Sequence, residues 1–167
     1  MSLLLDLDHS VSDALRVLSE TGWVRAVLEF FSEPASALVA LPFVVVYAVR
    51  GGAPARRRIL QAIVVVACSD FLSGVVLKNA FPRVRPNGTS SSFPSSHAAN
   101  AMGQAVFFSL CHPRLAPLLV PIAAMVCLSR VSLGKHWPTD VAAGALVGTL
   151  VAIAVWSLAR AWERRRT

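Results

Sequence analysis

The sequence predicts an all-α protein, a polytopic transmembrane bundle of about five helices preceded by an amphipathic helix at the membrane surface. Hydrophobic residues make up 55% of the 167 positions and the mean hydropathy is +0.60, which is more than the core of one soluble domain of this length requires. The apolar residues gather in runs close to the ~20 residues that cross a bilayer as a helix. Most charged residues lie between or at the ends of these runs.

Five apolar runs are predicted to span the membrane. They cover residues 35–49, 59–80, 95–112, 115–133 and 138–160. The first run is short and contains Pro42, which is expected to kink the helix or to let it start from an interfacial segment. The sequence shows no internal repeat or long low-complexity segment. Residues 1–167 are therefore expected to form a single membrane-embedded domain, with the helical bundle at 35–160.

Residues 1–31 have the pattern of a helix that lies on a membrane surface. Its apolar residues recur at helical spacing, and acidic and basic residues occupy the other faces. The apolar positions are Leu4, Leu7, Val11, Leu15 and Leu18. Trp23 suits an interface anchor. A secretory signal peptide is disfavoured, because acidic residues interrupt the apolar segment and no basic segment precedes it.

The distribution of arginine predicts how the chain is oriented. The loop "RGGAPARRR", the C-terminal "RAWERRRT" and Arg114 fall on one side of the threaded bundle, with nine arginines against the single Glu163. Because cytoplasmic loops carry the excess of basic residues, that side is expected to be cytoplasmic. The C-terminus is then cytoplasmic, and the N-terminal segment and the loop 81–94 are exoplasmic. The basic residues are thus explained by topology, and no nucleic-acid partner is predicted.

The cysteines indicate neither a disulfide framework nor a zinc site. Cys68, Cys111 and Cys127 all lie inside apolar runs, without the spacing of metal ligands. They are interpreted as small buried hydrophobic residues, and no metal or other cofactor is predicted.

Three clusters of ionisable residues are predicted to meet at the exoplasmic end of the bundle. Hairpin threading brings Lys78 and Arg85, after the second span, to the level of Arg130 at the end of the fourth. Packed cations repel one another unless an anion lies between them, and phosphate suits the planar fork of arginine. The segment "PSSH", with Ser95 and Ser96, opens a helix whose free N–H groups point to the same place. The pattern predicts a phosphate-binding site.

Two histidines beside such a site indicate hydrolysis through a phosphohistidine intermediate. His136 is favoured as the nucleophile, because Asp140 lies close enough in sequence to accept a hydrogen bond from its ring and to stabilise the charge that develops. Pro138 suits the first helical position and leaves His136 just before the helix. His97 is then the general acid of the first step and the base that activates water in the second.

The patterns Lys-x6-Arg-Pro at 78–86, Pro-Ser-Ser-His at 94–97 and Ser-Arg-x5-His-x3-Asp at 129–140 together resemble the signature of the type 2 phosphatidic acid phosphatase (PAP2) family. That family shares its site with vanadium haloperoxidases and glucose-6-phosphatase. The resemblance implies metal-independent hydrolysis of phosphate esters or diphosphates in a helical bundle. It assigns phosphate binding to Lys78, Arg85, Arg130, Ser95 and the adjoining backbone, catalysis to His97 and His136, and orientation of His136 to Asp140. Ser96 departs from the family, which more often has glycine there, so its contact with phosphate stays open.

The substrate is expected to be a lipid phosphate, since the site lies at the mouth of a membrane bundle beside Phe81, Phe93 and Trp137. The compact size resembles that of bacterial polyprenyl-phosphate and lipid A phosphatases, which favours a cell-envelope lipid and the bacterial plasma membrane. Phosphatidylglycerol phosphate and phosphatidic acid are the alternatives. A non-catalytic lipid-phosphate binder or transporter is a further alternative, although neither the nucleophile nor the acid is missing. The sequence leaves the oligomeric state open.

Other polar residues have structural interpretations. Arg83 and Lys135 are expected to be interfacial anchors, with Arg83 also able to guide an anionic substrate. Asp70 is expected to tie helices together, and Asn100 and Gln104 to make interhelical hydrogen bonds. The segment "GALVG" at 144–148 predicts close helix packing. His9 and His112 are expected to have no neighbours that would make a site.

Overall fold

The computed structural model describes residues 2–88 and 91–166, and it confirms the all-α prediction. In these residues the only β-type pairing is an isolated bridge between Val84 and Ser91. The α-helices are α1 (Ser2–Arg16), α2 (Gly22–Ser32), α3 (Leu41–Arg50), α4 (Gly52–Asp70), α5 (Leu77–Ala80), α6 (Ser96–Cys111), α7 (Ala116–Ser132) and α8 (Pro138–Arg164). Short 3-10 helices at Val17–Glu20, Pro34–Ala40 and Pro113–Leu115, and a π-helical segment at Phe71–Val76, connect them.

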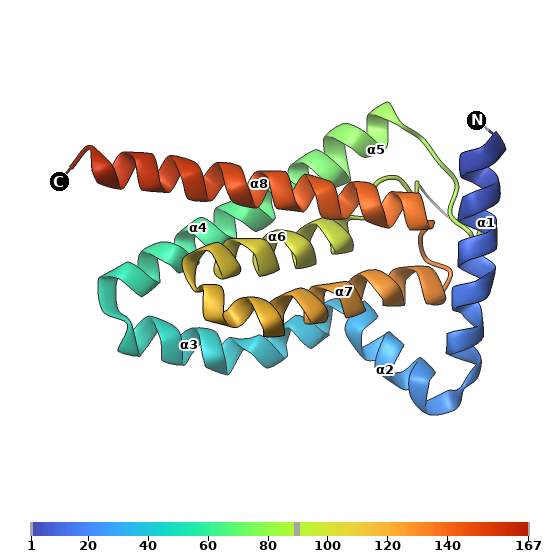
Figure 1. The fold of residues 1–167 in the computed structure, drawn as a ribbon, viewed down its shortest axis with the longest axis horizontal. Coiled ribbons are helices and arrows are strands. Elements are labelled where there is room, and N and C mark those ends of the chain that lie inside the picture. The colour runs from blue at the N-terminus through green and yellow to red at the C-terminus, as the bar shows by residue number, and fades with distance from the viewer. Residues whose placement is uncertain (1, 89–90, 167) are drawn as a thin grey trace.

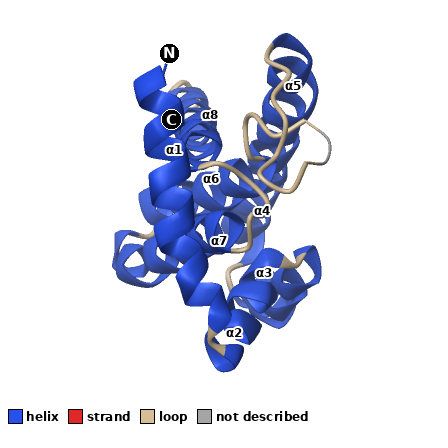
Figure 2. Cartoon of the chain, turned by 90° about the vertical axis from the view of Figure 1, so that its right-hand side faces the viewer, coloured by secondary structure: helices blue, strands red, loops and turns tan. Residues whose placement is uncertain are grey.

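Helix α6 lies at the centre of the bundle and packs against α4, α7 and α8 (Figure 1). Consecutive helices run up and down, so the end of α5, the start of α6, the end of α7 and the start of α8 lie at one end of the molecule. The C-terminus and the α3–α4 turn lie at the other end. Helix α1 crosses the first end at a steep angle to the bundle (Figures 1 and 2).

In the described residues, three helical stretches are long and apolar enough to cross a membrane. They are Gly52–Ala80, Pro113–Ser132 and Pro138–Arg164, with 29, 20 and 27 residues. The predicted spans 35–49 and 95–112 correspond to shorter helices. Pro42 stands in the first turn of α3, after a 3-10 segment, so it helps to start a helix and does not kink one. Helix α6 has 16 residues, about 24 Å, because Ser95 and His112 cap it at either end.

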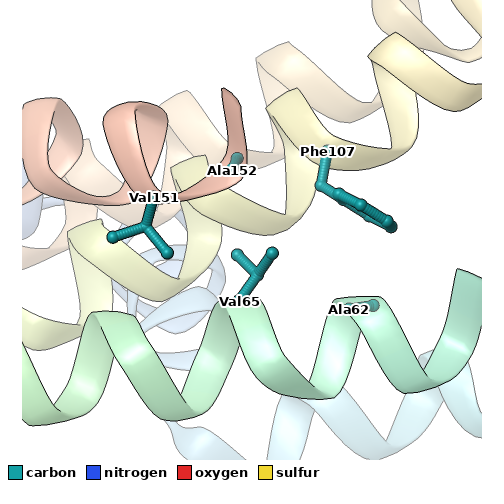
Figure 3. Packing of buried hydrophobic residues seen from close by; sticks show 5 residues of the cluster. All are labelled: Ala62, Val65, Phe107, Val151 and Ala152. Atoms are coloured by element: carbon teal, nitrogen blue, oxygen red, sulfur yellow. The ribbon is translucent and has the colours of Figure 1, made fainter. Parts of the chain in front are cut away.

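The apolar core lies where α4, α6 and α8 meet (Figure 3). Val65 of α4, Phe107 of α6 and Ala152 of α8 are fully buried there. Many larger apolar side chains of the long helices point outward instead, among them Leu60, Leu146 and Leu150. Such an outward apolar surface is what a bilayer covers.

The close packing predicted for "GALVG" is confirmed, because α8 meets the backbone of α6 through glycines. A methyl group on Gly148 would lie 1.9 Å from the carbonyl oxygen of Ala99, and one on Gly144 would lie 2.2 Å from that of Ser95. Gly103 of α6 faces Gly148. The glycines let two backbones approach each other, and this contact sets the distance between the starts of α6 and α8.

We expect Gly148→Ala to destabilise the fold by roughly 1–3 kcal/mol or more, since the added methyl group meets rigid backbone and the helices must separate. The midpoint of thermal unfolding in detergent would measure the loss. Gly22→Ala is the matched control, because a methyl group at Gly22 has nothing within 4 Å. Equal midpoints for the two variants would show that α6 and α8 separate at little cost.

The N-terminal segment is divided into α1 and α2 by a bend at residues 17–21. On the outer side of α1, Leu3 and Leu7 are half or more exposed, and Asp6 and Asp13 are exposed as well. The inner face is polar, with Asp8 and Ser12 buried against the bundle. The amphipathic segment predicted for 1–31 is therefore present as two helices, and α1 contacts the bundle through Asp8, Ser12 and Leu15.

Candidate active site

The ionisable residues predicted to converge do lie together, at the end of the bundle that α1 crosses. His97 begins α6 and lies within electrostatic range of Arg130 from α7, His136 from the loop before α8, and Lys78 from α5. Arg85, in the loop after α5, lies within range of Lys78, Arg130 and His136. Residues from five segments thus form one basic cluster. The hairpin threading of the helices explains why segments so distant in sequence meet (Figure 1).

Arg130 is the most deeply buried cation of the cluster, with 4% of its surface exposed. Its Nη1 donates to the carbonyl oxygen of Ser32 at 3.0 Å and to the Ser32 hydroxyl at 2.7 Å. Within the described part of the chain its Nε has no hydrogen-bond partner. A buried guanidinium beside two other cations and with an unused donor is the environment that an oxyanion stabilises.

Ser95 and Ser96 begin helix α6 at the same place. Ser95 is the N-cap residue, and its hydroxyl accepts a hydrogen bond from the backbone N–H of Ala98 at 3.4 Å. Its own N–H donates to the backbone oxygen of Asp140 at 3.0 Å, which joins α6 to α8. The Ser95 hydroxyl is therefore fully buried in a cap, whereas Ser96 is partly exposed in the first turn. The first turn of α6 directs its free N–H groups toward the cluster.

His136 and Asp140 are both buried, and Ser92 joins them. The Nδ1 of His136 lies 3.8 Å from Oδ2 of Asp140, which is longer than a hydrogen bond. The Ser92 hydroxyl donates to that oxygen and lies 3.5 Å from the same Nδ1. The N–H of Trp137 also donates to Asp140 Oδ2, at 2.9 Å. Asp140 thus fixes the start of α8 and faces the imidazole at the same time.

Burial lowers the pKa of His136 below its ordinary value, and the charges of Arg130 and Arg85 lower it further. The carboxylate of Asp140 acts in the opposite direction but does not cancel the effect of burial. The ring is therefore neutral at neutral pH. A neutral imidazole has the free lone pair that a nucleophile needs.

The lowered pKa of His136 predicts the acid limb of the pH profile. As the pH falls through that pKa, the ring takes up a proton and loses its lone pair, so kcat/KM of a phosphatase using this ring should fall only below about pH 6.5. Arg130→Gln removes a positive neighbour and should move the limb to higher pH. An acid limb above pH 7 in the unmodified protein would contradict a neutral His136 at neutral pH.

The interpretation of Arg83 and Lys135 as interfacial anchors is wrong, because both are tied into the protein. The Nη2 of Arg83 lies 2.6 Å from Oδ2 of Asp8, and its Nη1 lies 2.9 Å from Oδ1 of Asp140. The Nζ of Lys135 donates to the Ser32 hydroxyl at 2.9 Å. Arg83 therefore bridges helix α1 and the carboxylate beside His136.

The structural roles predicted for Asp70, Asn100 and Gln104 are confirmed. The Nδ2 of Asn100 donates to Asp70 Oδ1 at 2.8 Å, and the Nε2 of Gln104 donates to the carbonyl oxygen of Ala62 at 2.9 Å. Both bonds join α6 to the α4 segment. These polar groups hold α6, the central helix that carries His97, in place against α4.

Sequence reasoning missed four residues that support the cluster, namely Asp8, Ser32, Ser92 and Thr139. Ser92 stands in the serine-rich segment just before "FPSSH", and that proximity was the available signal. Asp8 and Ser32 lie far away in sequence and carry no pattern. His9 and His112, for which no site-forming neighbours are expected, each contact one aromatic residue. The His9 ring lies 4.6 Å from that of Trp137, and the His112 Nε2 lies 2.8 Å from the Tyr47 hydroxyl.

Sequence comparisons identify a family and relatives for this chain. A sequence model described as the PAP2 superfamily matches residues 58–164. The chain is 38% identical over 79 residues to a lipid A 1-phosphatase of Porphyromonas gingivalis, an alignment that covers 44% of this chain and 18% of that protein. It is 40% identical over 102 residues to a decaprenylphosphoryl-5-phosphoribose phosphatase of Mycolicibacterium smegmatis, covering 54% of this chain and 55% of the relative. In both cases it spans less than two thirds of the relative's length.

A solved structure resembles the whole fold. It is the crystal structure of a transmembrane PAP2 type phosphatidylglycerolphosphate phosphatase from Bacillus subtilis. The two chains share 27% sequence identity and superpose with a TM-score of 0.75, over 96% of this chain and 88% of the other. The similarity therefore includes the N-terminal helices as well as the bundle.

Proposed function

The chain belongs to the PAP2 superfamily, and from that premise we propose that it is a metal-independent membrane phosphatase that removes a phosphate from a lipid phosphate or diphosphate of the cell envelope. The observation that supports this most is the meeting of three cations and two histidines at the starts of α6 and α8. A tetrahedral phosphoryl group is the ligand that such a cluster suits.

The proposed reaction has two steps. Lys78, Arg85, Arg130 and the first turn of α6 bind the phosphoryl oxygens, and the His136 nitrogen remote from Asp140 attacks phosphorus. A P–N bond forms, the bond from phosphorus to the lipid oxygen breaks, and that oxygen takes a proton from His97. In the second step His97 takes a proton from water, the water oxygen attacks phosphorus, and the P–N bond breaks to release inorganic phosphate. Asp140 stabilises the positive charge on the His136 ring in between.

A lipid of the polyprenyl phosphate, polyprenyl diphosphate or lipid A type is the favoured substrate. The relatives named after lipid A and decaprenylphosphoryl sugars support this choice. Phe81 and Phe93, whose ring centroids lie 5.9 Å apart, stand at the same end of the bundle and offer an apolar contact for the lipid chain. Phosphatidylglycerol phosphate is the alternative, supported by the name of the Bacillus subtilis structure. Phosphatidic acid belongs to the same alternative class.

The protein is an integral membrane protein, and we place its active site on the exoplasmic face of a bacterial plasma membrane. The arginine-rich segment 50–58, at the end of α3 and the start of α4, and the C-terminal arginines lie at the end of the bundle opposite the cluster, and the rule that basic segments stay in the cytoplasm supports this orientation. We treat residues 1–167 as one phosphatase domain without a nucleic-acid partner.

Release of inorganic phosphate from purified protein in detergent tests the function. The substrates would be a polyprenyl diphosphate, a polyprenyl monophosphate, lipid A, phosphatidylglycerol phosphate and phosphatidic acid, each assayed with EDTA present. We expect turnover, fastest with an envelope lipid. Saturable binding of these lipids without any phosphate release would identify a binder or transporter instead. Activity that EDTA abolishes and added metal restores would contradict metal independence.

Labelling with a membrane-impermeant thiol reagent tests the orientation. In a chain whose three native cysteines are replaced, Val84→Cys should react in intact cells, because residue 84 is exposed at the active-site end. Arg165→Cys, at the C-terminal end, should react only after lysis. The reverse pattern would place the active site in the cytoplasm.

A further inference from the structure

One side chain of the surface helix α1 reaches into the active site. Asp8 is 2% exposed. Its Oδ2 accepts hydrogen bonds from the Arg83 guanidinium at 2.6 Å and from the Thr139 hydroxyl at 2.6 Å. Its Oδ1 accepts from the Thr139 N–H at 2.9 Å. Thr139 lies in the first turn of α8, directly before Asp140. A residue near the N-terminus therefore caps the helix that carries the candidate catalytic carboxylate.

Arg83 connects Asp8 to the candidate catalytic residues. The same guanidinium that pairs with Asp8 lies 2.9 Å from Oδ1 of Asp140. Asp140 is fully buried and faces His136 with its other oxygen. One cation is thus shared by two carboxylates. The Arg83 side chain is 24% exposed, and without Asp8 the carboxylate that remains beside its guanidinium is the buried one of Asp140.

We propose that Asp8 is a positioning residue of the active site, so that helix α1 is part of the catalytic unit and not only a membrane anchor. The inference rests on the proposed phosphatase function. Asp8 binds Arg83 directly and also through the Thr139 hydroxyl, and Arg83 in turn holds the Asp140 carboxylate where it can stabilise the charge on His136. Without Asp8, Arg83 draws Asp140 away from the imidazole, which weakens the phosphohistidine state more than it weakens substrate binding.

The variant Asp8→Asn tests the role, with Asp6→Asn as its matched control on an exposed position of the same helix. We expect Asp8→Asn to lower kcat by about 10- to 100-fold with KM changed by less than about twofold, as for groups that orient a catalytic residue. Asp6→Asn should match the unmodified protein, and Asp8→Glu should recover part of kcat. The double variant with Arg83→Ala should lose little more than Arg83→Ala alone. Independent, additive losses, or a rise in KM at constant kcat, would overturn the proposal.

An accessibility measurement separates this proposal from the phosphatase function. In a chain without its native cysteines, Ser12→Cys on the buried face of α1 should react with a thiol reagent much more slowly than Ser10→Cys on the exposed face. Equal rates would show that α1 is not seated on the bundle and would overturn the inference even in an active enzyme. Slow labelling of Ser12→Cys in a protein that hydrolyses no lipid phosphate would sink the proposed function instead.

A basic pocket lies at the end of the bundle opposite the basic cluster, between α4, α6 and α8. It has a volume of about 100 Å³ and is lined by the guanidinium groups of Arg57, Arg58 and Arg160. One carboxylate, Glu163, lies 3.2 Å from Arg57 and offsets part of this charge. With three arginines and one glutamate in its lining, the pocket has a net positive charge.

Two further contacts give this pocket the character of a binding site. The Nη1 of Arg58 is held by the Tyr47 hydroxyl at 3.3 Å and lies 3.0 Å from the His112 Nε2, so this guanidinium is fixed by uncharged groups from two other segments. The guanidinium of Arg160 lies 5.3 Å from the ring centre of Trp156, which also lines the pocket. Arginine beside tryptophan at the end of a membrane helix is the combination found where lipid headgroups lie.

Independently of the phosphatase function, we propose that this pocket binds the phosphodiester headgroup of an anionic phospholipid of the adjoining leaflet. The headgroup phosphate accepts from the guanidinium forks, and the acyl chains lie along the outward apolar surfaces of α4 and α8. The charge explains the preference for an anionic lipid over a zwitterionic one. Bound lipid would hold together the ends of α4, α6 and α8, which line the pocket.

Thermal unfolding in mixed micelles tests the second site, with Arg130→Gln as the background so that the active site contributes little. Phosphatidylglycerol should raise the unfolding midpoint and phosphatidylcholine should not. The increase should disappear in Arg58→Gln and in Arg160→Gln and persist in the control Arg165→Gln, which does not line the pocket. Inorganic phosphate at the same concentration should have no effect. Equal effects of both lipids, equal stabilisation by inorganic phosphate alone, or an unchanged response in the pocket variants would each overturn the assignment.

Discussion

His136→Ala is expected to lower kcat by at least ~10³-fold, the scale seen when a nucleophile is removed. No other described side chain at this end of the bundle combines burial, a lowered pKa and a carboxylate at 3.8 Å from its ring. Without the imidazole no P–N bond forms, and water must attack phosphorus directly. Phosphate release over a range of substrate concentrations measures the loss.

The control for His136→Ala is a measurement of whether the variant still folds and binds its substrate. The variant should bind lipid phosphate and unfold at a temperature close to that of the unmodified protein, because the cations of the site remain. A covalently phosphorylated protein should be trapped by acid quenching in the unmodified chain and be absent from the variant. Turnover within tenfold of the unmodified protein would remove His136 from the nucleophile role.

Arg130→Gln is expected to lower kcat/KM by at least ~10²-fold. Each hydrogen bond from a guanidinium to an anionic oxygen contributes about 1.5–3 kcal/mol, and the fork of arginine can supply two of them to a phosphoryl group. The burial of Arg130 strengthens both, since little water competes. Activity assays measure the loss, and Arg114→Gln, on an exposed turn at the other end of the bundle, serves as the control.

A binding measurement checks the same residue without turnover. Inorganic phosphate should raise the unfolding midpoint of the unmodified protein, because an anion relieves the repulsion between Arg130, Arg85 and Lys78. The effect should be much smaller in Arg130→Gln and unchanged in Arg114→Gln. A full phosphate response in Arg130→Gln would show that Arg130 does not contact the anion.

The residues of the cluster could be predicted because each one stands at the end of an apolar run. Spans of alternating direction must bring Lys78, His97, Arg130 and His136 to one level, whatever the detailed packing. The same reasoning fails for contacts that depend on side-chain geometry. Hydropathy gives no signal that Ser92 lies beside Asp140, since that contact depends on how residues 91–95 fold back on the bundle.

The errors in the prediction have physical causes as well. The run at 35–49 is apolar, but a 3-10 segment and Pro42 limit its α-helix to Leu41–Arg50, which hydropathy does not register. The run at 95–112 matches α6 to within one residue at each end. Arg83 resembles an anchor because its position relative to the membrane is all that the sequence reveals. Its partner Asp8 is 75 residues away in the chain, and a single acidic residue carries no pairing information.

Asp140 is the point where the architecture and the chemistry of this protein cannot be changed independently. Its carboxylate holds the first turn of α8 through Trp137, and its backbone oxygen holds the first turn of α6 through Ser95. One residue, Asp140, therefore positions both rings of the proposed mechanism, His136, which takes the phosphoryl group, and His97, which transfers the protons. Random mutagenesis should find position 140 intolerant of every replacement for any lipid offered, whereas efforts to alter selectivity have free scope around Phe81 and Phe93, which no such tie constrains.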